Sequence, residues 1–404
     1  MDRAFLVAVL ESQATPSGKY LIILPLSILL FEVIRTAIQP PIYAFQNLAL
    51  DRSHYAPGLE LTKPQSSPNN PVRAGDKAKQ IYIGEDGFRA DPQRHRGNPA
   101  RCHHVLIGDS MIYGFGLAYA DTLRPVLKTM GVDACVYGVT GNSPIDYLVT
   151  LKYVQDRIED GAQVAIYVYA YNDFVSLRKY LERGLLGRSP SFVTAMDLIN
   201  YYDDWRRTTF IQGYLRKTTK AAALPLGKWR LKIGATKEIE VVWPHDPAQY
   251  QPAAPLDREQ RATFEFFLER LRALRAGRPW RVLIVFIPDN DEMLANLAHP
   301  SSSFEDLDPR RVEALRICAA MWSDCHDLTR YLYQRAITAG QFPFLLSDRH
   351  LSRFGNQIVA EHYLSTVKGS VHATALWRKP AGDRFVTNWS RHHRNEKIRA
   401  TAWN

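Results

Sequence analysis

The sequence lacks the residue spacings that mark most small metal-binding and nucleic-acid-binding domains. Its four cysteines form no CxxC pair, which argues against zinc-ribbon and thioredoxin-type chemistry. It has no zinc-finger spacing, no RNP-like aromatic motif and no basic zipper, so nucleic acid is a weak explanation for the net charge of +10. A basic chain of this kind is better matched to acidic glycans or lipid headgroups. We therefore expect no metal, no cofactor and no nucleic-acid partner.

The four cysteines, Cys102, Cys135, Cys318 and Cys325, leave the redox state open. Cys318 and Cys325 are close enough in the chain to pair, and an oxidising compartment would permit a disulfide. Buried free thiols explain the same spacing equally well.

Long hydrophobic runs are also scarce, and the first notable one, at 20–38, is interrupted by Glu32 and Arg35. A spanning helix needs about 20 mostly apolar residues, so this run is marginal. No small-x-small cleavage site follows it, which argues against a removed signal peptide. We predict an uncleaved single-pass anchor within 1–50, in the inner membrane, with the rest of the chain on the periplasmic side. A buried or membrane-lying helix is the alternative.

Composition divides the rest of the chain into a linker, one large domain and a tail. Residues 51–80 are rich in Pro, Ser, Asn and charge, which is typical of a linker. The domain is predicted over 81–370, with an insertion at about 174–256. Residues 371–404 form a basic tail with interspersed tryptophans.

Within the domain, short apolar runs alternate with amphipathic segments. Strands are predicted at 105–107, 135–139, 164–169, 282–287 and near 326–328. Helices are predicted at 122–130, from Ser143 onward, and at 257–276, 309–321 and 351–364. Such alternation gives right-handed crossovers and a parallel sheet with helices on both faces. We therefore predict a flavodoxin-like three-layer α/β/α sandwich with an inserted helical region.

Polar motifs follow the first three predicted strands in order. Gly108-Asp109-Ser110 ends the first, a Gly-containing loop up to Gly141 follows the second, and Asn172-Asp173 follows the third. Ligands of open α/β sheets bind at the carboxyl ends of the strands, so these loops should converge there. A serine hydroxyl needs an adjacent imidazole to take its proton. His350 is the best candidate, because it lies directly before the last predicted helix.

This ordered set resembles the SGNH/GDSL hydrolase family, and GEDGFR with GDSMIYGFGLAYADTLRPVL resembles its bacterial, membrane-anchored branch. The resemblance covers about 81–173 and 257–366. It implies that Ser110 is the nucleophile, His350 the base and Asp348 the acid that orients His350. It also implies an oxyanion hole formed by the N–H groups of Ser110 and Gly141 and the side-chain amide of Asn172.

The chain departs from the family pattern at two places. The family often has two residues between its last Asp and His, whereas Asp348 is separated from His350 by one, and Ser347 occupies the usual Asp position. Val136 replaces an Asn that often precedes the Gly loop.

Asp289, Asp291 and Glu292 follow the fourth predicted strand at the same edge. Carboxylates can hold a hard cation. No His lies at ligand spacing, so a solvated acidic loop is the prediction and a metal site the alternative.

The insertion carries aromatic and basic residues, such as Trp205, Arg206, Trp229 and Arg230, which favour an anionic glycan or envelope lipid. An amphipathic surface helix is the alternative. The predicted function is hydrolysis of acyl esters, O-acetyl esters above all, of a cell-envelope glycan or lipid through an acyl-Ser intermediate. The alternatives are a polysaccharide O-acetyltransferase working with a membrane acyl-donor protein, and a non-catalytic envelope scaffold.

Overall fold

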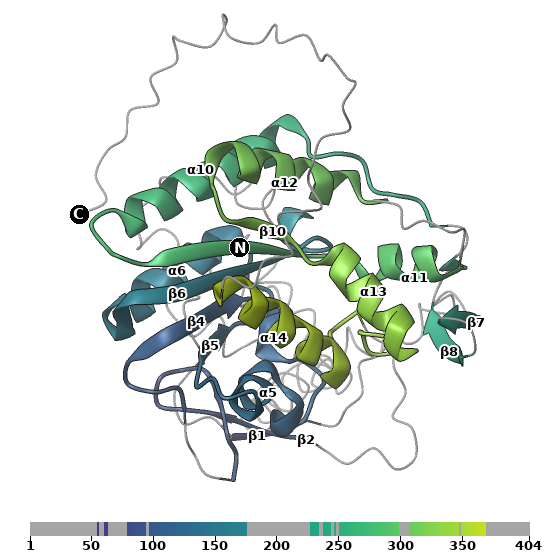
Figure 1. Cartoon of the computed structure of the whole chain (residues 1–404), viewed down its shortest axis with the longest axis horizontal. Coiled ribbons are helices and arrows are strands. Elements are labelled where there is room, and N and C mark those ends of the chain that lie inside the picture. Colours follow the sequence, from purple (N-terminus) through teal and green to yellow (C-terminus); the bar gives the residue numbers. More distant parts are fainter. Residues whose placement is uncertain are drawn as a thin grey trace, which may run out of the picture.

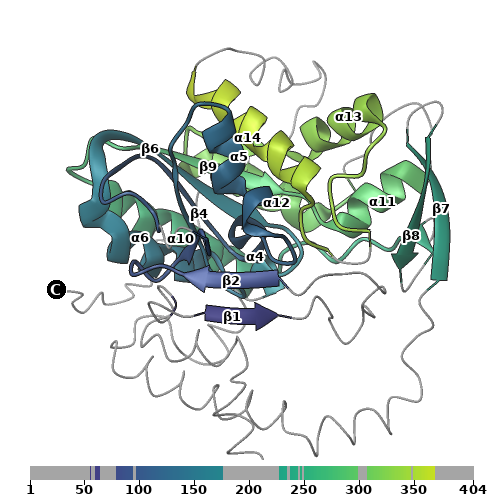
Figure 2. The same cartoon turned by 90° about the horizontal axis from the view of Figure 1, so that it is seen from below.

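The computed structural model has an α/β fold built on one parallel sheet, which confirms the predicted class (Figures 1 and 2). Five strands lie in the order β10-β9-β6-β4-β5, and every neighbouring pair is parallel. They are β4 (Cys102–Gly108), β5 (Cys135–Gly138), β6 (Ile158–Tyr169), β9 (Arg281–Ile287) and β10 (Cys325–Asp327). The structure describes residues 55, 60–63, 79–93, 97–175, 227–233, 237–243, 246–247, 250–298, 307–346 and 349–368.

Helices cover both faces of this sheet and give three layers (Figure 1). One face carries α6 (Pro144–Val154), α10 (Arg258–Arg275) and α12 (Pro309–Met321). The other carries α5 (Leu123–Thr129), α11 (Asn290–Ala298), α13 (Thr329–Ala339) and α14 (Arg353–Val367). Side chains alternate across a strand. In β4, Val105 and Ile107 therefore enter one core while Leu106 enters the other.

A small antiparallel sheet of β1 (Glu60–Lys63), β2 (Lys79–Ile83) and β3 (Arg89–Ala90) precedes the main one. The linker predicted over 51–80 is therefore wrong at β1, which pairs with β2, and at Tyr55, which is 1% exposed. The Tyr55 ring packs 5.4 Å from that of Tyr113, so this segment belongs to the domain. The composition of 51–80 did not indicate this packing, because a single buried aromatic residue, Tyr55, makes the contact with Tyr113.

The described part of the insertion is a hairpin of β7 (Gly227–Ile233) and β8 (Lys237–Trp243), which corrects the helical prediction there (Figure 2). Its side chains follow a period of two, with Leu231 and Ile233 buried and Arg230 and Lys232 exposed between and beside them. The register sets Arg230 opposite Glu240, and Lys232 opposite Glu238. Arg230 and Lys232 of this hairpin therefore face acidic partners. Residues 176–226 lie outside the described residues.

The acidic loop predicted at Asp289, Asp291 and Glu292 is wrong, because this segment begins helix α11. Glu292 is fully buried and forms an ion pair of 2.8 Å with the equally buried Arg311 of α12. Arg311 also binds Asp327 of β10, so one guanidinium joins three elements.

All four cysteines are paired. Cys102–Cys135 links the beginnings of β4 and β5, with Cα atoms 5.9 Å apart. Cys318–Cys325 links α12 to β10, at 6.1 Å. Cys318 and Cys325 therefore form the disulfide that their spacing allowed and are not free thiols. The first disulfide joins cysteines that are 33 residues apart in the sequence.

The predicted anchor within 1–50 and the tail at 371–404 lie outside the described residues. Among the helices that the structure describes, none is long and apolar enough to cross a bilayer.

The buried imidazole of His362, on α14, should make stability depend on pH. Burial lowers its pKa from 6.5 to about 4, and His326 adds to the effect. The unfolded chain therefore binds the proton more tightly, so the stability associated with neutral His362 is complete above pH 6.5 and is lost as the pH falls towards 4. We expect this residue to reduce the free energy of unfolding by about 2 kcal/mol between about pH 7.5 and about pH 5.

Urea unfolding of wild type and His362→Gln at both pH values measures the contribution of His362 to the pH dependence of the free energy of unfolding. His103→Gln is the control, because the His103 side chain is 51% exposed. An equal loss of stability in wild type and His362→Gln would contradict the expectation.

Candidate active site

Ser110 lies where β4 turns into the short helix α4 (Ser110–Tyr113), at the carboxyl edge of the sheet. Asp109 caps this helix, and its Oδ1 accepts a hydrogen bond of 2.9 Å from the N–H of Met111. The helix lies directly on Gly138 of β5, where an added Cβ would stand 2.2 Å from the Tyr113 nitrogen. Glycine at 138 is thus needed for α4 to hold Ser110 in place.

His350 reaches Ser110 from 240 residues away, with its Nε2 2.8 Å from the Ser110 Oγ. The Ser110 Oγ also lies 3.3 Å from a carboxylate oxygen of Asp109, so the imidazole is the nearer partner. The ring of Phe115 packs against the imidazole, with centroids 4.6 Å apart. A hydroxyl and an imidazole at this separation have the geometry of an activated nucleophile.

The other predicted residues take different positions. The Asn172 amide hydrogen-bonds to Asp109, while its Oδ1 is buried without a hydrogen-bond partner in the part of the chain that is described. Gly141 has a φ of 78°, which favours glycine, and open space surrounds the position of its missing Cβ. Asp348 and Ser347 lie outside the described residues. The structure thus brings Ser110 and His350 into contact and connects Asn172 to them through Asp109.

The loop of Gly141 is held beside Ser110 by two contacts. The N–H of Val139 donates to the Gly108 carbonyl at 3.1 Å. The N–H of Thr140 donates to the hydroxyl of Tyr55 at 2.9 Å. Tyr55 therefore supports the site, which its place in a linker-like segment gave no reason to expect.

Buried carboxyl groups underlie the turns that carry Ser110 and Asn172. Burial raises the pKa of Asp109, and hydrogen bonding from Met111 opposes part of that rise. Burial also raises the pKa of Asp173, and Asp109 adds to the effect. Asp173 accepts hydrogen bonds from the Tyr147 hydroxyl at 2.7 Å and the Tyr169 N–H at 2.9 Å, so its role is to fix the loop after β6.

Arg349, the chain neighbour of His350, is fixed on both sides. Its guanidinium lies 2.9 Å from a carboxylate oxygen of Asp291 and 3.5 Å from one of Asp289. It also stacks 3.8 Å from the ring centre of Tyr171. Burial first, and then Asp291, raise the pKa of Asp289 to about 7. This network ties the His350 segment to the carboxyl end of β9.

Arg89 holds the far end of α4. The guanidinium is buried and donates to the Gly114 carbonyl at 2.5 Å and the Leu117 carbonyl at 2.6 Å. Arg89 ends the GEDGFR segment, which pointed to the resemblance but not to this contact. Among the described residues, no three His, Cys, Asp or Glu side chains gather as a metal site.

No protein-family model matches the sequence, and no curated protein sequence matches it. Among solved structures, the chain is similar to a member of the lipolytic protein G-D-S-L family from Veillonella parvula DSM 2008. The two are 13% identical, with a TM-score of 0.32, over 65% of this chain and 97% of that chain. The strand order and the two cores define the fold, and the contacts of Ser110 and His350 define the site.

Proposed function

We propose that this protein is a serine-dependent ester hydrolase of the SGNH/GDSL type. The observation that carries the proposal is the 2.8 Å contact between the His350 Nε2 and the Ser110 Oγ at the carboxyl edge of a parallel sheet. A structural serine at this turn needs no imidazole, whereas a nucleophilic serine requires one.

In the proposed mechanism, His350 takes the hydroxyl proton of Ser110 as its Oγ attacks the ester carbonyl carbon. The negative charge then develops on the former carbonyl oxygen, and the N–H groups of Ser110 and Gly141 stabilise it. An amide nitrogen carries two hydrogens, so Asn172 can donate one to Asp109 and the other to this oxygen. His350 protonates the departing alcohol, and water activated by His350 then releases the acid. Asp348 would orient the imidazole.

For the substrate, we propose acyl esters, O-acetyl esters above all, of a cell-envelope glycan or lipid. The protein would be held in the inner membrane by 1–50, with its catalytic domain on the periplasmic side. Two disulfides support this location, because they form and persist in oxidising compartments. A transferase would share the acyl-Ser intermediate and would take its acyl group from a partner membrane protein or a soluble donor.

A fluorophosphonate probe tests the proposal directly. We expect one label per chain, placed on the Ser110 peptide by mass spectrometry and absent from Ser110→Ala. Ser143→Ala is the control, because Ser143 is buried and caps α6. A folded protein that neither takes the label nor hydrolyses simple esters would be a scaffold, and the proposal would be wrong. Acetylated glycan formed on adding acceptor sugars would instead favour the transferase.

The ion pairs of Arg349 should matter for turnover. Arg349→Ala frees the segment that carries His350, and a displacement of about 1 Å can cost about 10²-fold in rate. We expect kcat for p-nitrophenyl acetate to fall by about that factor, with little change in KM, and Arg349→Lys to restore part of it. The control is Arg353→Ala, because the Arg353 side chain is 68% exposed. A kcat of Arg349→Ala within about twofold of wild type would rule out this positioning role.

A further inference from the structure

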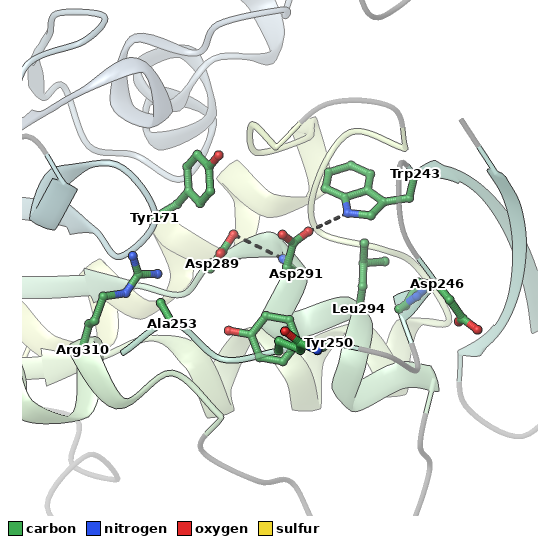
Figure 3. A pocket seen from close by; sticks show the side chains of 11 residues that line it. Tyr171, Trp243, Asp246, Tyr250, Ala253, Asp289, Asp291, Leu294 and Arg310 are labelled. Carbon is green, nitrogen blue, oxygen red and sulfur yellow. Dashed lines mark hydrogen bonds between the residues drawn. The ribbon is translucent and has the colours of Figure 1, made fainter. Parts of the chain in front are cut away.

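A cavity of about 440 Å³ lies between the carboxyl end of β9 and the end of the β7–β8 hairpin (Figure 3). This volume is within the range of small-molecule sites. Three aromatic rings from separate segments line it, those of Tyr171, Trp243 and Tyr250. The carboxylates of Asp289 and Asp291 line the same space.

The cavity adjoins the site through chain neighbours of the proposed catalytic residues. Tyr171 directly precedes Asn172. Arg349 directly precedes His350 and pairs with the two lining carboxylates. A ligand in the cavity would therefore extend away from Ser110 along the same sheet edge.

The walls are fixed before any ligand binds. The indole N–H of Trp243 donates to the Asp291 Oδ1 at 2.6 Å (Figure 3). The indole N–H of Trp229 donates to the Trp243 carbonyl at 3.1 Å, which ties the end of β8 to β7. A preorganised wall of this kind loses little conformational entropy on binding.

Three of the four charged side chains that line the cavity, Asp289, Asp291 and Arg310, already form ion pairs, and the fourth is Asp246. Arg349 pairs with Asp289 and Asp291, and it already stacks on Tyr171. Arg310, the cation that lines the cavity, bonds to Asp308 at 3.3 Å. An anionic ligand would thus meet aspartates whose cations are engaged, and a cationic ligand would find Arg349 already placed over the rings of Tyr171 and Trp243.

We propose that this cavity binds the neutral sugar ring of a saccharide ester, the alcohol part of the substrate cleaved at Ser110. The proposal rests on the proposed function and names its substrate class. Arg349 lies over Tyr171 and Trp243, so among the described lining rings Tyr250 supplies the aromatic face for the C–H groups of a sugar. Carboxylates suit its hydroxyl groups. Burial first, and then Asp291, raise the pKa of Asp289, which makes its protonated, donating form more accessible than that of an exposed carboxyl.

Direct binding tests the cavity without turnover. Saturation-transfer NMR on the full-length Ser110→Ala protein would compare methyl glucoside, glucuronate and choline. We expect methyl glucoside to bind about tenfold or more tightly than either charged compound. Tyr250→Ala should abolish this binding, and Ala253→Trp should abolish it by filling the cavity that Ala253 lines. Tyr153→Ala, at an exposed tyrosine of α6, should have no effect.

Comparing the hydrolysis of a sugar ester with that of a simple ester tests the sugar site separately from the proposed esterase activity. We expect Tyr250→Ala and Ala253→Trp to lower kcat/KM for 6-O-acetylglucose about tenfold through KM, while p-nitrophenyl acetate is hydrolysed as by wild type. Tighter binding of glucuronate or choline, or undiminished glucoside binding by both variants, would overturn the sugar site even if simple esters are cleaved. Glucoside binding by a protein that cleaves no ester would overturn the esterase instead.

Discussion

We expect His350→Ala to lower kcat for a simple acyl ester about 10⁴–10⁶-fold, and Ser110→Ala to lower it by a similar factor. The reason is the 2.8 Å contact between their reacting atoms. Without the imidazole the hydroxyl keeps its proton and is a poor nucleophile, and without the hydroxyl there is nothing to acylate. Stopped assays with p-nitrophenyl acetate, corrected for uncatalysed hydrolysis, measure the residual rate.

The double variant Ser110→Ala/His350→Ala should be no slower than either single variant, because the two residues act as one unit. His103→Ala, at an exposed histidine of β4, is the matched control and should leave kcat unchanged. Losses that multiply in the double variant would show that the two side chains act independently. That result would contradict a nucleophile–base pair even if both positions matter.

The second large effect concerns stability. We expect Arg311→Met to lower the free energy of unfolding by about 3–5 kcal/mol, because it leaves a buried carboxylate without its counter-ion. Glu292 is the partner most affected, since both of its carboxylate oxygens bind the guanidinium, at 2.8 and 3.2 Å. Asp327 loses its ion pair as well. Chemical denaturation followed by circular dichroism measures the change.

Arg316→Met supplies the control on the same helix. Its side chain is 75% exposed and lies 3.7 Å from Glu313, so its loss should cost less than about 1 kcal/mol. Arg311→Met/Glu292→Met should recover part of the stability, because apolar side chains can replace a buried ion pair. An Arg311→Met protein within about 1 kcal/mol of wild type would show that water or rearrangement compensates the carboxylates.

The parts of the fold that the sequence predicted are those set by local pattern. Continuous apolar runs marked the buried strands, as in β9, and a proline start marked α12 at the same bounds, Pro309–Met321. Helix α11 was missed because its acidic first turn masked the apolar Met293, Leu294 and Leu297 that follow. The buried position of Glu292 in this acidic turn is explained by its ion pair with Arg311, which the sequence does not reveal.

The catalytic pair was predictable for a topological reason. Ser110 follows a strand, His350 precedes a helix, and parallel strands bring their carboxyl ends to one edge. The supporting contacts were not predictable. Tyr55 reaches Thr140 across 85 residues, and Arg349 reaches Asp289 from another part of the chain. Sequence spacing does not predict such pairs, because they depend on how the folded helices, strands and loops pack against one another.

The 240-residue separation of Ser110 and His350 also has a consequence for the folding pathway. Closing so large a loop costs entropy that only contacts formed across the whole sheet can offset. Pairings that are distant in sequence form slowly. The nucleophile and its base should therefore meet only after β9 and β10 have joined the strands that precede them. Ester-cleaving activity would then return in refolding as a late signal, after most of the secondary structure has formed.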